Sequence, residues 1–221
     1  TGIPLAAATN PGGTAPSSRE DAGAAIDGDE ETKEEMSAAS QVRKMFVPTD
    51  VTGRAVVGPS GADSDACGTL ASPCRTLNRG LRTPATGVYL APGVHEMGTA
   101  AVVGGGDVFI GSLAGKDATL IDCRGGPGGI EARNNASLRV RGLSMARCTN
   151  GHGGCLSARS SHLLLRDVAL SECHATSPTD PKGGAIYCEG GAFAASGLTV
   201  TRSSAKYGGG VHLFDCKASL K

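Results

Sequence analysis

Apolar positions recur at a fixed step in the second half of the chain. Short alternating segments begin at Ala118, Leu143, Val168 and Leu198, so the steps between them are 25, 25 and 30 residues. The longer step contains a Pro-rich insertion, ATSPTDPK, at 175–182. Pairs of glycines keep the same step, at Gly128-Gly129, Gly153-Gly154, Gly183-Gly184 and Gly208-Gly209. A period of this length is typical of a solenoid, whose repeats bury their apolar faces against one another.

The pattern inside each repeat indicates strands. The segments VRGLSMARC (140–148) and LRDVALSEC (165–173) also fit the frame of a leucine-rich repeat. That repeat needs an amphipathic helical stretch after its strand, but here a Gly-Gly pair and a second alternating segment follow, as in GGAIYCEGG at 183–191. Short strands with Gly, Asn and Ser corners predict one coil of a parallel β-helix for each repeat, and therefore an all-β fold.

Residues one repeat apart should lie on adjacent rungs, about 4.7 to 4.9 Å apart. We therefore expect one inward ladder of Leu120, Met145, Leu170 and Val200, with Ala118, Leu143, Val168 and Leu198 beside it, and a second ladder of Ile130, Leu156, Ile186 and Val211. The glycine pairs just before the second ladder are expected at corners, since glycine adopts positive φ without a Cβ penalty.

Composition supports a narrow core and limits the partners. The chain has 34 Gly, four Phe, three Tyr and no Trp, so few large side chains are available to fill a wide interior. Lys plus Arg and Asp plus Glu both number 21, so no bulk basic field favours nucleic acid. We also predict no membrane segment in this chain, because no apolar run approaches the roughly 18 residues that would span a bilayer.

The N-terminal part differs in composition. Residues 1–55 show no sustained apolar period and contain an acidic cluster from Asp27 to Glu35, so we predict a disordered, low-complexity acidic linker. The Glu, Lys, Ala and Met content of 29–45 is compatible with one short helix. The β-helix domain is then expected over 56–221, incomplete at its C-terminus because the chain ends within the repeat pattern.

One stretch resembles a known family. Residues 58–97 contain GTLASPCRTL and then GVYLAPGVHEM, which is similar to the start of right-handed β-helix proteins of the pectin lyase-like superfamily. The resemblance implies an N-terminal cap with a short helix at 75–81 and a first strand at 88–95. The later GGAI and GGGV units are similar to the repeats of polymorphic outer membrane proteins. The resemblance extends over about 56–221. The superfamily that it implies includes polysaccharide lyases, glycoside hydrolases and non-catalytic adhesins.

The eight cysteines indicate an oxidising compartment, and therefore an extracellular or cell-surface protein. Cys67 and Cys74 are expected to close a small loop on the cap. Cys123, Cys148 and Cys173 follow at steps of 25, so Cys148 can bond to either neighbour but not to both. The partners of Cys155, Cys188 and Cys216 stay open, and reduced thiols stacked in a narrow core are the alternative.

Asn135 begins the tripeptide Asn-Ala-Ser in an expected turn, so it is a candidate for N-glycosylation in a secreted glycoprotein.

Charged residues provide the only candidates for catalysis. The register places Asp122, Arg147, Glu172 and Arg202 on successive rungs, where alternating charges favour a ladder of ion pairs. If the protein is an enzyme, Asp122, Arg147 and Glu172 are the candidate catalytic residues. The resemblance to the pectin lyase-like superfamily then implies calcium as the cofactor of a lyase. We assign no other catalytic residue and no cofactor-binding residue. We also assign no metal ligand, because the C-x-x-C pairs of a zinc site are missing.

These observations favour a non-catalytic β-helix module that serves as a stalk, in adhesion, or in recognition of a glycan or a cell-surface protein. The alternative is a carbohydrate-active enzyme, either a polysaccharide lyase or a glycoside hydrolase.

Overall fold

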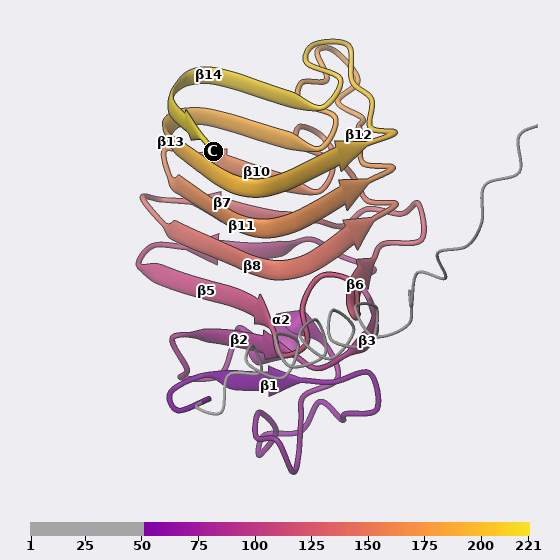
Figure 1. The fold of residues 1–221 in the computed structure, drawn as a ribbon, viewed down its shortest axis with the longest axis vertical. Helices are drawn as coiled ribbons and strands as arrows, with labels where there is room; N and C mark the ends of the chain where they lie inside the picture. The colour runs from indigo at the N-terminus through magenta and orange to yellow at the C-terminus, as the bar shows by residue number, and fades with distance from the viewer. Residues whose placement is uncertain (1–50) are drawn as a thin grey trace, which may run out of the picture. The chain divides into compact units, whose positions relative to one another are not determined.

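The computed structural model describes residues 51–221, and these residues form an all-β parallel solenoid (Figure 1). Of the linker predicted over 1–55, residues 1–50 lie outside the described residues, as does the short helix expected at 29–45. The first strand begins at Ala55, beside the boundary expected between linker and solenoid.

The strands before residue 137 are short, whereas four of the later strands have ten residues or more. The early strands are β1 (Ala55–Val57), β2 (Gly87–Leu90), β3 (Gly93–Glu96), β4 (Ala101–Gly104), β5 (Asp107–Ser112), β6 (Thr119–Asp122) and β7 (Ile130–Arg133). The later strands are β8 (Ser137–Ala146), β9 (Thr149–Asn150), β10 (Leu156–Arg159), β11 (His162–Ser171), β12 (His174–Ala175), β13 (Ile186–Thr201) and β14 (Val211–Leu220). The helix α2 spans Leu77–Gly80.

Parallel pairing divides each coil into three faces. The first face stacks β1, β2 and β5, followed by the N-terminal halves of β8 and β11, and then 192–196 of β13. The second face stacks β3 and β6 on the C-terminal halves of β8 and β11. The third face stacks β4, β7, β10 and the beginning of β13. The strands β8, β11 and β13 are long because each continues round a corner, as the curved ribbons in Figure 1 show.

The inward ladders lie on the inner sides of these faces and form the core. The ladder of Ile130, Leu156, Ile186 and Val211 is confirmed. The pairings of Leu143, Val168 and Leu198, and of Met145, Leu170 and Val200, are also confirmed. Most of these side chains are fully buried, whereas Leu198, Val200 and Val211 near the C-terminus are partly buried.

The predicted first members of two ladders, Leu120 and Ala118, are wrong. Ile121 pairs with Met145 and is buried, whereas Leu120 pairs with Ser144 and is half-buried, and Ala118 is exposed. The prediction aligned the coils on Cys123 and its counterparts. However, Cys123 follows the end of β6 directly, whereas Arg147 lies between the end of β8 and Cys148. A slip of one residue exchanges the inward and outward sides of a strand.

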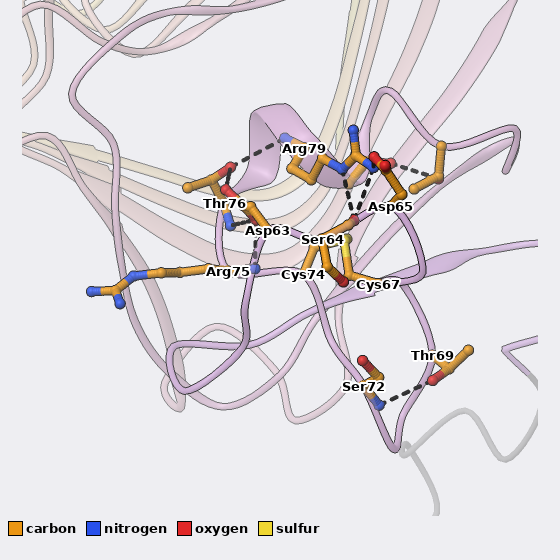
Figure 2. The surroundings of a disulfide bond; sticks show 12 residues. Asp63, Ser64, Asp65, Cys67, Thr69, Ser72, Cys74, Arg75, Thr76 and Arg79 are labelled. Carbon is orange, nitrogen blue, oxygen red and sulfur yellow. Dashed lines mark hydrogen bonds and ion pairs between the residues drawn. A yellow bond between two sulfur atoms is a disulfide. The ribbon is translucent and has the colours of Figure 1, made fainter.

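The cap begins the solenoid. Its helix is shorter than the 75–81 expected, because it starts only after the N-cap residue Thr76, whose hydroxyl accepts a hydrogen bond from the Arg79 backbone N–H. The single strand expected at 88–95 is two strands, β2 and β3, which flank Ala91 and Pro92. The polar network beside this helix is centred on Asp63 (Figure 2).

The glycine pairs lie at corners, as predicted. Gly153, Gly183 and Gly208 have φ values of 63°, 62° and 61°, a conformation that side chains with a Cβ rarely adopt. The second glycine of a pair is confined for a different reason, since a Cβ on Gly184 would lie 1.8 Å from the Gly209 carbonyl oxygen. Small residues are therefore needed where successive coils approach most closely.

Candidate functional site

Four disulfides connect the cysteines of the described residues, and none of these cysteines is free. The pairs are Cys67–Cys74, Cys123–Cys148, Cys155–Cys173 and Cys188–Cys216. The structure thus joins Cys148 to Cys123, and Cys173 takes Cys155 as its partner. The alternative of stacked reduced thiols is wrong, and no described cysteine is available as a thiolate ligand.

The three candidate catalytic residues lie on one corner, between the second and third faces. The guanidinium of Arg147 forms a two-pronged ion pair with the carboxylate of Asp122, and its Nε lies 3.0 Å from Oδ1. Glu172, on the next coil, forms an ion pair of 3.1 Å with Arg202. Arg147, Glu172 and Arg202 all have positive φ, so the same turn repeats from coil to coil. We call Asp122, Arg147, Glu172 and Arg202 the corner ladder.

Electrostatics keep the first pair of the corner ladder, Asp122 and Arg147, charged. The hydrogen bond from Arg147 lowers the pKa of Asp122, helped by a hydrogen bond from the Arg124 backbone N–H, although burial opposes ionisation. The same contact raises the pKa of Arg147 further above its ordinary value. A general base has to accept a proton near the working pH, and a carboxylate held ionised by a guanidinium is poorly suited to that task.

A shallow hollow of about 440 Å³ lies beside the corner ladder and is lined by Arg124, Arg147, Glu172 and His174. It contains one carboxylate among cations, so it lacks the paired carboxylates of a glycosidase. Within residues 51–221, no three His, Cys, Asp or Glu side chains gather closely enough to hold a metal ion.

Asn135 lies in the turn between β7 and β8, and it is exposed. Its backbone N–H donates to the Ser160 carbonyl at 2.9 Å. The exposed position is compatible with glycosylation of Asn135, which stays a prediction.

A second site, which the sequence analysis missed, lies on the outer side of the first face. A groove of about 580 Å³ crosses β8, β11 and β13 and extends from Phe109 on β5 to the end of β14. Its lining contains five cations and no acidic side chain; the cations are Arg54, Arg139, Arg141, Arg166 and Lys221. We call this site the basic groove.

The repeat itself contained the signal for the basic groove. Arg141 and Arg166 are 25 residues apart and pair directly across β8 and β11. The sequence predictions were drawn from the inward ladders and the corner charges, whereas these two arginines occupy outward positions directly before the corner residues Gly142 and Asp167. An arginine repeated at the solenoid period predicts a cationic stripe along the axis.

No model of a known protein family, no curated protein and no solved structure matches this chain. The described residues also contain no helix that is both long and apolar enough to cross a membrane.

Proposed function

We propose that this chain acts outside the cell as a non-catalytic recognition module, in which stacked coils hold a binding surface rigid. Disulfides persist in oxidising compartments, so four of them in the described residues support an extracellular location. A solenoid presents its outward residues in fixed rows, which suits an extended partner.

The observation that carries the proposal is the state of the corner ladder. Asp122 is bound to Arg147, and Glu172 is bound to Arg202. These contacts occupy the charges that a lyase or hydrolase would need, so the corner ladder serves to hold neighbouring coils together. The lining of the basic groove, by comparison, contains five cationic side chains and no acidic one.

The finer features belong to the same proposal. A right-handed coil, a relation to the pectin lyase-like superfamily and to polymorphic outer membrane protein repeats, a role in adhesion, and a glycan on Asn135 are all consistent with a parallel solenoid of this composition. Each remains a proposal that further experiments have to test.

The test compares turnover with binding on the same preparation of the full chain. Polyuronates and neutral glycans are assayed for unsaturated uronate products and for released reducing sugar, with and without calcium. Arrays of glycans and of cell-surface proteins are probed in parallel. Binding without turnover supports the recognition module.

Turnover that disappears in both Asp122→Asn and Glu172→Gln would overturn the proposal and establish the enzyme alternative. An absence of both turnover and binding would leave a stalk and contradict recognition. The variant Asp65→Asn is the matched control, since Asp65 forms an exposed ion pair with Arg79 on the cap, away from the corner ladder and from the basic groove.

A further inference from the structure

The basic groove is built from two neighbouring rows of outward side chains on the first face. One row contains Phe109, Arg139, Leu164 and Ala194, which the parallel register places opposite one another from β5 to β13. The other row lies two residues further along each strand and contains Gly111, Arg141, Arg166 and Ser196. The rows differ in character, because apolar side chains predominate in the first and arginines in the second.

The first row supplies an apolar floor. Leu164 is 40% exposed, and Ala194 is next to it on β13. Phe109 continues the floor on β5, where its ring packs over Gly111 and against Tyr89. The cation of this row, Arg139, forms an ion pair of 3.1 Å with Asp107, outside the groove lining.

The second row supplies the charge. Arg141 and Arg166 lie on adjacent rungs, so their backbones are about 4.8 Å apart. The Arg166 side chain is 63% exposed, and its one ion pair is a long contact of 3.7 Å with the neighbouring Asp167. Arg54 adds a further guanidinium at the Phe109 end, where it lies 4.8 Å from the ring centroid.

This combination points to the chemistry of the occupant. Guanidinium groups bind carboxylates with two parallel hydrogen bonds, which favours an acidic ligand. The exposed Leu164 and the half-buried Ala194 favour a ligand that also has an apolar side chain. Arginine and aromatic residues are the residue types enriched at protein–protein interfaces, whereas lysine is depleted there.

We propose that the basic groove binds a short acidic segment of a partner protein, with an aliphatic or aromatic side chain over Leu164 and Ala194 and carboxylates on Arg141 and Arg166. This inference rests on the proposed recognition function and specifies the partner. A sulfated polysaccharide would satisfy the arginines but would leave the apolar floor without a counterpart. Nucleic acid is less well matched, since the chain has no net charge.

The experiment uses the full chain as bait for a display library of random short peptides at low ionic strength. The double variant Arg141→Gln/Arg166→Gln serves for counter-selection. We expect the enriched peptides to combine several Asp or Glu residues with one apolar residue. Selection of basic or uncharged peptides, of acidic peptides that also bind the double variant, or of no peptide at all would overturn the proposal.

One enriched peptide is then synthesised with a fluorescent label, and its affinity is measured by anisotropy. We expect each single variant, Arg141→Gln or Arg166→Gln, to weaken binding by roughly five- to tenfold, because it removes a charge-assisted hydrogen bond. Leu164→Ser should weaken binding by a similar factor. The matched controls are Arg82→Gln on the cap and Val102→Ser on β4, both exposed, and we expect less than a twofold change for each.

Heparin provides the competing outcome. If heparin binds the full chain and Leu164→Ser leaves that binding unchanged while the peptide does not bind, the groove is a polysaccharide site and the proposal is wrong. This failure is distinguishable from failure of the recognition function, because array binding without turnover would still stand. Circular dichroism and a thiol count on every variant establish that the fold and the four disulfides are retained.

Discussion

At the scale of single residues, Asp63 determines how the cap is closed. Its carboxylate accepts hydrogen bonds from the Arg75 backbone N–H at 2.8 Å, the Thr76 backbone N–H at 3.0 Å and the Thr76 hydroxyl at 2.7 Å (Figure 2). Burial opposes ionisation of Asp63, but the hydrogen bonds from Thr76 and Arg75 outweigh it and lower the pKa. One exposed carboxylate thus ties the loop before Cys67 to the start of α2.

We expect Asp63→Ala to destabilise the cap by about 1 to 2 kcal/mol, since it leaves these donors without their acceptor. The free energy of unfolding from urea titrations measures the effect. The lowered pKa stabilises the fold above pH 3.8, the ordinary value for Asp, and this contribution is lost as the pH falls through the folded pKa. Asp65→Ala is the control, because Asp65 is fully exposed and forms only one ion pair, with Arg79. Equal losses in the two variants would contradict the role of Asp63.

We expect His95 to make the solenoid sensitive to mild acid. The ring is 5% exposed, its Nε2 lies 2.7 Å from the Ala91 carbonyl oxygen, and its Nδ1 is buried without a hydrogen-bond partner. Burial lowers the pKa of His95, although the hydrogen bond to Ala91 opposes the shift. The neutral ring with Nε2 as donor fits this site, and a second proton on Nδ1 would have no acceptor.

Because the folded pKa is below the ordinary value of 6.5, the unfolded chain binds more protons than the folded chain once the pH falls below 6.5. We therefore expect the melting temperature to decrease from pH 7 to pH 5. His95→Leu should make this decrease smaller, and scanning calorimetry over that range measures it. Burial also lowers the pKa of His152, so His152→Gln should remove a separate part of the same decrease. A pH profile unchanged in His95→Leu would argue against this explanation.

At the scale of elements, the sequence predicted the strands best where the repeat was regular. The alternation over 165–173 and the glycine pairs predicted the later coils, since inward positions and corners both follow the 25-residue step. The early strands were less well predicted, because the coils before residue 118 differ in length and Pro92 divides the expected first strand. Cross-coil pairing of Cys155 with Cys173 could not be predicted, since it depends on how two faces meet inside the core.

The candidate site was predicted in part for a similar reason. Alternating charge at the solenoid period predicted the contact of Asp122 with Arg147 and that of Glu172 with Arg202, because side chains on adjacent rungs are neighbours. The basic groove depends on side chains from separate strands and on the small residues between them, such as Gly111 and Ser196. Its shape emerges only when the coils are stacked.

The glycine at the closest approach of two coils provides a test of the stacking. A methyl group on Gly184 would lie within 2.6 Å of backbone atoms of both Gly209 and Ser204, so the next coil would have to move away. We expect Gly184→Ala to destabilise the fold by roughly 2 to 4 kcal/mol through overpacking against a rigid backbone. Gly151→Ala is the matched control, because nothing lies within 4 Å of its Cβ position and its φ is not in the left-handed region. Thermal unfolding compares the two variants, and similar melting temperatures would refute the close approach.

At the scale of the whole described solenoid, each coil is stabilised mainly by the coils next to it. Each inner coil pairs with the coils on either side, as β11 pairs with β8 and β13. In such an architecture, stability is approximately a sum of the terms for each coil and for each interface between neighbours. Local damage should therefore spread to neighbouring coils before it reaches the cap.

Leu163 tests this expectation in the middle of the stack. Its side chain is fully buried and lies between Leu138 on one neighbouring rung and Phe193 on the other. Leu163→Ala should cost about 2 to 5 kcal/mol through the cavity it creates. Hydrogen exchange should then accelerate most in β8, β11 and β13, and least in β1 and β2, because the cap is stabilised by its own disulfide and by Asp63. Leu164→Ala, on the adjacent and outward position, should leave the exchange pattern nearly unchanged. A uniform acceleration from β1 to β14 in Leu163→Ala would instead show that the solenoid opens as a single cooperative unit.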